Sequence, residues 1–157
     1  MICETPQEFV AALPAYGALM GLDLGDKTIG LAVYDTFRSS ASPLETIRRK
    51  KFTPDATAML AVATERNIAG LVLGLPRNMD GTEGARCQST RAFARSLTRM
   101  TDLPITYWDE RLSTVAAEKA LLEADTTRKR RAEVIDHVAA SYILQGLLDR
   151  LGHMKAE

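Results

Sequence analysis

The feature that most constrains this chain is a pair of short apolar runs around a polar turn near its start. Residues 18–24 and 29–34 flank a Gly-Asp-Lys-Thr turn, a pattern typical of a tight antiparallel β-hairpin. Asp23 lies inside the first run, where a carboxylate costs free energy unless a cation or hydrogen-bond donors satisfy it. Asp23 is therefore a candidate site residue, and a carboxylate that only accepts hydrogen bonds from the turn is the alternative interpretation.

The remaining patterns alternate between strand and helix. A continuous apolar run at residues 68–74 is typical of a strand covered on both faces, and we expect it to be central and parallel to the first strand. An alternating run at 42–48 indicates an edge strand. The other expected elements are a strand at 103–108, a helix capped by residues 109–114, and helices at about 5–13, 53–66, 83–98 and 132–151.

The composition is that of an ordinary soluble globular protein. A chain of 157 residues predicts one domain over 1–157, to which residues 1–15 add an N-terminal helix. The chain has neither a secretory leader pattern nor an apolar run of about 18 residues, so we expect a cytoplasmic protein with no membrane partner. Cys3 and Cys87 match no metal or disulfide motif, and we interpret both as free thiols.

The formal net charge is zero, so any affinity for nucleic acid must come from local basic clusters. Arg91, Arg95 and Arg99 recur every four residues and share one face of the predicted helix. No acidic residue lies between residues 85 and 101, which favours an external anion facing this stripe. A second basic run, residues 128–131, leads into the last helix. A solvated surface is the alternative interpretation of both clusters.

Three carboxylates occupy places where polar residues are least expected. Asp23 lies in a strand, Glu110 follows the last strand, and Asp136 interrupts the apolar face of the last helix. If the three converge, their mutual repulsion requires a cation, and hard oxygen ligands suit Mg²⁺ or Mn²⁺. Such a site can hydrolyse phosphodiester bonds through metal-activated water.

Four motifs, in order, give the chain a likeness to a known family. It closely resembles the YqgF/RuvX family of the RNase H-like superfamily over about residues 20–148. The motifs are residues 21–32 (GLDLGDKTIGLA), 72–76 (VLGLP) with Asp80-Gly81, 108–114 (WDERLST) and 135–145 (IDHVAASYILQ). Thr28 departs from the family, whose members often have arginine there, and this removes one possible phosphate contact.

The resemblance implies an RNase H-like α/β fold, a five-stranded mixed sheet flanked by helices. It also implies that Asp23, Glu110 and Asp136 are the catalytic and metal-binding triad, with Mg²⁺ or Mn²⁺ as cofactor. The expected activity is a metal-dependent nuclease, a hydrolase acting on ester bonds, that processes the 5′ end of pre-16S rRNA in ribosome biogenesis. The alternatives are a Holliday junction resolvase in DNA recombination or repair, and a non-catalytic RNA-binding factor.

The expected partner is nucleic acid, either structured RNA or branched DNA, bound by a monomer or weak homodimer. A sugar-kinase-like function would need a second phosphate hairpin and an adenosine-binding segment, and the sequence has neither. The residues expected to contact nucleic acid are Lys27, Arg77, Arg91, Arg95, Arg99, Arg111, Arg128, Lys129, Arg130 and Arg131.

Overall fold

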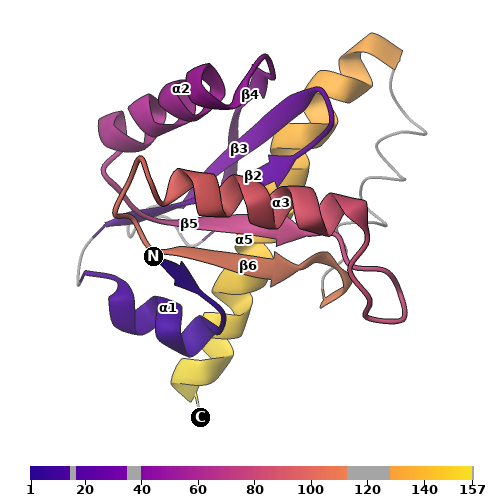
Figure 1. Cartoon of the computed structure of the whole chain (residues 1–157). Helices are drawn as coiled ribbons and strands as arrows, with labels where there is room; N and C mark the ends of the chain where they lie inside the picture. Colours follow the sequence, from indigo (N-terminus) through magenta and orange to yellow (C-terminus); the bar gives the residue numbers. More distant parts are fainter. Residues whose placement is uncertain (15–16, 35–39, 113–127, 157) are drawn as a thin grey trace.

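The fold is a mixed β-sheet with helices on both faces (Figure 1). The structure, a computed structural model, describes residues 1–14, 17–34, 40–112 and 128–156, with the backbone alone described along 128–137 and 153–156. Six strands lie in the order β1-β6-β5-β2-β3-β4. Their bounds are β1 Ile2–Cys3, β2 Ala18–Leu24, β3 Thr28–Tyr34, β4 Ser42–Arg48, β5 Ile68–Leu75 and β6 Ile105–Asp109.

Helices cover the sheet in two layers. One apolar cluster joins α1 and α5 to one face, and a second joins α2 and α3 to the other. No helix in the described ranges is long and apolar enough to cross a membrane. The predicted helix after Asp109 begins as a 3₁₀ turn, η1, and its continuation over 113–127 lies outside the described residues. The bounds are α1 Pro6–Ala12, α2 Phe52–Glu65, α3 Ala85–Leu97, η1 Glu110–Leu112 and α5 Arg128–Ala156.

Strand β2 is the axis of this arrangement because it pairs with β3 on one side and β5 on the other. Its side chains alternate between the faces: Leu19 packs with the α5 cluster, whereas Met20 and Leu22 pack with the α2–α3 cluster. A Cβ added to Gly21 would lie 2.8 Å from the carbonyl oxygen of Ala140 on α5. Only glycine therefore lets α5 lie directly on β2.

The predicted hairpin and the parallel central pair are both confirmed. Asp23 pairs with Gly30 across the hairpin, and the Gly25 N–H donates to the Thr28 carbonyl oxygen at 2.9 Å. β5 is parallel to β2, and β4 lies at the sheet edge as expected.

Two expectations about the elements need correction. The five-stranded sheet has a sixth strand, β1, which pairs in parallel with β6. Helix α2 begins at Phe52, one residue before the expected Thr53. Both carboxylate oxygens of Asp55, in the first turn of α2, accept from the Lys50 N–H, at 3.0 and 3.1 Å, and so fix the chain entering the helix.

Candidate active site

The carboxyl ends of β2, β5 and β6 meet at one edge of the sheet. Leu22 pairs with Leu73, so the next residue on each strand, Asp23 and Gly74, are neighbours at that edge. Gly74 in turn pairs with Trp108 on β6. Asp23 is two residues beyond Gly21 and therefore points to the same face of the sheet, the one that α5 covers. Asp23 is only 5% exposed, so a charged residue is buried at this edge.

Glu110 reaches the same place from a different element. It is the first residue of η1, directly after β6. A Cβ added to Gly74 would lie 2.7 Å from Glu110 Oε1, so this carboxylate rests on the Gly74 backbone. Since neighbouring strands are about 4.8 Å apart, Asp23 and Glu110 occupy adjacent positions on one face. Neither carboxylate is without an interaction partner.

The third predicted carboxylate, Asp136, is described by its backbone alone. It lies on α5 one turn before Ala140, the residue whose carbonyl oxygen faces Gly21. Among the side chains that the structure describes, no group of three or more His, Cys, Asp or Glu could hold a metal ion. Asp136 is not one of those side chains. The two carboxylates that do meet supply hard oxygen donors, the ligand type that fits Mg²⁺ or Mn²⁺.

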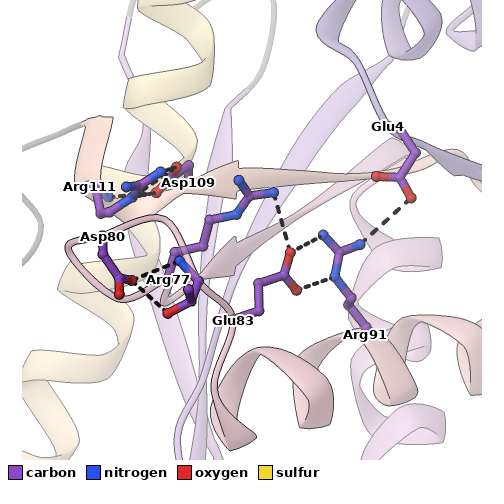
Figure 2. A network of polar contacts seen from close by, with 8 residues as sticks. Glu4, Arg77, Asp80, Glu83, Arg91, Asp109 and Arg111 are labelled. Atoms are coloured by element: carbon purple, nitrogen blue, oxygen red, sulfur yellow. Dashed lines mark hydrogen bonds and ion pairs between the residues drawn. The ribbon is translucent and has the colours of Figure 1, made fainter.

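The loop after β5 is held by hydrogen bonds within itself and lies beside Asp109 and Arg111 (Figure 2). Asp80 Oδ1 accepts hydrogen bonds from the Thr82 N–H at 2.9 Å and from its hydroxyl at 2.6 Å, and these bonds hold the pKa of Asp80 below its ordinary value. Arg111 links the loop to η1, because its Nη1 donates to the Met79 carbonyl oxygen at 3.4 Å. The loop is therefore attached to η1, the turn that carries Glu110.

Arg111 also pairs with Asp109, the last residue of β6. Its Nη2 lies 2.7 Å from Asp109 Oδ2, and its backbone N–H donates to Oδ1 at 3.0 Å. Burial alone would raise the pKa of Asp109, but the hydrogen bonds and charge of Arg111 outweigh it and hold that pKa below its usual value. Asp109 is thus ionised and paired with Arg111.

The sequence favoured an external anion facing Arg91, but a carboxylate of the chain itself faces this residue. Arg91 Nε and Nη2 donate to the two carboxylate oxygens of Glu83 at 2.6 and 2.8 Å, and Arg77 lies 3.4 Å from the same carboxylate (Figure 2). Hydrogen bonding from Arg91 lowers the pKa of Glu83, and the same bond raises the pKa of Arg91. Arg91 also stacks on Tyr107 and reaches Glu4 at 3.7 Å. Its stabilising anion is therefore internal.

The other basic residues predicted to contact nucleic acid lie in different parts of the molecule. Arg95 and Lys27 are exposed. Helix α3, about 20 Å long at 1.5 Å per residue, runs back from the carboxyl edge, so Arg99 beyond its end lies near the opposite edge of the sheet from Asp23. Arg128 to Arg131 begin α5, and their side chains lie outside the described ones. The arginine stripe as a whole is thus not beside the carboxylates.

Comparisons with known proteins show the family to which the chain belongs. The RuvX model, described as Holliday junction resolvase, matches residues 17–150. A protein of Ruegeria pomeroyi named "Putative pre-16S rRNA nuclease" is 75% identical over 154 residues, covering 98% of this chain and 100% of that protein.

Two solved structures share the fold at low sequence identity. The Fowlpox virus resolvase, solved with substrate Holliday junction DNA, has a TM-score of 0.51 at 9% identity, covering 85% of this chain and 98% of that one. Thermus thermophilus RuvC has a TM-score of 0.50 at 13% identity, covering 86% of this chain and 96% of that one. The six-stranded sheet is thus the RNase H-like fold of the RuvC type. The chain belongs to the RuvX family of Holliday junction resolvases, nucleases that hydrolyse phosphodiester bonds.

Proposed function

We propose that this protein is a divalent-metal-dependent nuclease that processes the 5′ end of precursor 16S rRNA. The observation that carries the proposal is that Asp23 and Glu110 occupy adjacent positions on one face at the carboxyl edge of the sheet. The name of the Ruegeria pomeroyi relative supports RNA as the substrate. Localisation in the cytoplasm, where ribosomes are assembled, follows from the same proposal.

The two carboxylates have different supports, which suit different tasks. Asp23 pairs with Gly30 on β3, and the preceding residue Leu22 pairs with Leu73 on β5, so the sheet fixes the backbone that carries Asp23. Glu110 lies at a strand end on a short 3₁₀ turn, which can shift as substrate enters. We assign the third position of the set to Asp136, which lies on α5 one turn before Ala140. When bound, Mg²⁺ or Mn²⁺ activates water as the nucleophile and stabilises charge on the phosphate.

Basic residues around this edge would hold the phosphate backbone without reading bases. Lys27, at the tip of the β2–β3 turn, is exposed and follows the strand that carries Asp23. Arg128, Lys129, Arg130 and Arg131 begin α5, eight to five positions before Asp136. Arg77, Arg91 and Arg111 are engaged in internal ion pairs, so we assign them to positioning the loop and η1. Arg95 and Arg99 would contact a strand that continues along α3.

Cleavage of branched DNA is the second candidate function, because the family is described as Holliday junction resolvase. Resolving a symmetric junction needs two active sites and hence a dimer. Processing one RNA end needs a single site, so a monomer or weak homodimer is sufficient.

Side-by-side cleavage assays test the proposal. Labelled precursor rRNA 5′ ends, single-stranded RNA and a four-way DNA junction would be incubated with the protein in Mg²⁺ and in Mn²⁺, with Asp23→Asn as the inactive control. We expect wild-type protein to cut the precursor end fastest. Faster cutting of the junction, together with dimers in solution, would establish the second function, and equal activity of Asp23→Asn would refute the site.

A further inference from the structure

A basic cavity lies on the other face of the sheet from the carboxylates. Its volume is about 480 Å³, and its walls are the β2–β3 turn, the segment after β4 and the first two turns of α3. Leu24, which contributes to the cavity, directly follows Asp23 but packs with the α2–α3 cluster, because successive side chains of a strand point to opposite faces. The cavity therefore starts one residue from the proposed cleavage site.

The charge of the cavity suits an anion. Arg49, Lys50 and Arg86 line it, against one carboxylate, that of Asp26. Asp26 is exposed, so water screens its charge. Within the described part of the chain none of the three cations takes part in an ion pair, whereas Arg91 on the same helix is neutralised by Glu83.

Two contacts hold one cation of the cavity, Arg49, in place. Arg49 Nη1 donates to the Gly25 carbonyl oxygen at 2.7 Å, and its guanidinium lies over the Phe93 ring at 5.8 Å. Arg86 and Ser89 are three residues apart on α3, so they share the face that lines the cavity. Arginine and hydroxyl groups on one surface are the donors that proteins use for phosphate oxygens.

The start of α3 adds to this preference. Its N-cap residue is Gly84, no side chain caps it, and its first turn contains no acidic residue. The backbone N–H groups of that turn and the positive end of the helix dipole thus favour an anion where Ala85 and Arg86 enter the cavity.

We propose that this cavity binds a backbone phosphate of the nucleic-acid substrate next to the bond that is cut. The inference rests on the proposed function and names a second contact for the same substrate. A strand whose scissile phosphate lies at Asp23 would pass the carboxyl end of β2, and the neighbouring phosphate would enter the cavity beyond Leu24 and Gly25.

The test combines protein variants with single neutral linkages in the RNA. All proteins carry Asp23→Asn so that bound RNA is not cut. Arg86→Ala and Lys50→Ala each remove one cavity cation, and Arg66→Ala removes an exposed arginine at the far end of α2 as the charge-matched control. The linkages around the mapped cleavage position are replaced one at a time by uncharged methylphosphonates.

We expect one neutral linkage beside the cleaved bond to weaken binding roughly tenfold in the Asp23→Asn parent and in the Arg66→Ala control. The same linkage should cause little further loss in Arg86→Ala. Each cavity variant should also lower the slope of log K against log salt by about 0.7.

Other outcomes separate the cavity from the proposed function. Unchanged slopes in both cavity variants, with tight RNA binding by the parent protein, would overturn the cavity and leave the nuclease function standing. Absence of both RNA cleavage by wild-type protein and RNA binding by the parent would overturn both. A third outcome is that inorganic phosphate shifts the amide resonance of Ser89, while no methylphosphonate substitution weakens RNA binding. The cavity would then hold free phosphate, and this result would also refute the proposal.

Discussion

The two faces of the sheet differ in charge at the edge where β2, β5 and β6 end. The α5 face carries the carboxylates Asp23 and Glu110, and the α2–α3 face carries the cations Arg49, Lys50 and Arg86. Strand alternation separates these sets by a single residue, since Asp23 and Leu24 are consecutive. One strand can therefore present a proposed metal ligand on one face of the sheet and lead to the proposed phosphate contacts on the other face.

The largest effects should come from removing charge on the α5 face. Asp23→Asn, Glu110→Gln and Asp136→Asn should each lower the cleavage rate by at least about 100-fold, more than loss of a residue that only supports a metal ligand. Folding should be unchanged or improved, because like charges repel one another when no cation is bound. Single-turnover cleavage and thermal unfolding measure the two effects. Wild-type rates in any variant would remove that residue from the site.

A divalent metal ion should stabilise the folded protein only when the carboxylates of the α5 face are intact. At 100 times its dissociation constant, Mg²⁺ or Mn²⁺ should stabilise the wild-type protein by about 2.7 kcal/mol through preferential binding to the folded state. Asp23→Asn should lose this gain and Arg86→Ala should keep it. Calorimetry with and without metal provides the measurement, and equal stabilisation of all three proteins would mean that the metal binds elsewhere.

A methyl group at the centre of the α5 face should disturb both packing and chemistry. In Gly74→Ala the new Cβ would meet Ile143 Cδ1 and lie 2.7 Å from Glu110 Oε1, so overpacking should cost about 1–3 kcal/mol and displace that carboxylate. Gly152→Ala on α5 is the control, since nothing lies within 4 Å of its Cβ, and helix propensity should stabilise it by up to about 1 kcal/mol. Denaturant unfolding and cleavage rates would be compared. Normal stability and activity of Gly74→Ala would contradict the close approach of Glu110.

The smallest effect should come from Glu83, in the loop between β5 and α3. Glu83→Gln should destabilise the protein by about 1 kcal/mol at neutral pH, because it weakens the bonds to Arg91 and Arg77.

The pH dependence of this effect has a definite sign. Folding holds the pKa of Glu83 below its ordinary 4.5, so its stabilisation is complete above pH 4.5 and is lost as the pH falls through the lower, folded value. The difference between wild type and Glu83→Gln should therefore shrink below pH 4.5. Urea unfolding between pH 3 and 7 measures it, with Glu45→Gln, an exposed carboxylate on β4, as the control. A difference that is independent of pH would mean that Glu83 contributes by packing alone.

Sequence patterns predicted the elements in which the apolar residues form a regular or continuous pattern. The hairpin and β5 are long enough for apolar periodicity to be decisive, whereas β1 has two residues and no period at all. Asp23 stood out because it interrupts an apolar strand. The internal partner of Arg91 escaped notice because Glu83 precedes α3 and meets the arginine eight residues later, beyond any helical spacing rule. The cavity needs three segments brought together by the sheet, which no local pattern reveals.

The pairing of β1 with β6 covers the backbone edge of β6. The Met1 carbonyl oxygen accepts the Ile105 N–H at 2.8 Å, and the Cys3 carbonyl oxygen accepts the Thr106 hydroxyl at 3.0 Å. At the other border of the sheet, β4 carries Pro43 and Glu45, residues that discourage edge-to-edge pairing. The first three residues therefore protect the edge of β6. A chain that lost them would expose unpaired backbone N–H and C=O groups of β6 and would tend to aggregate.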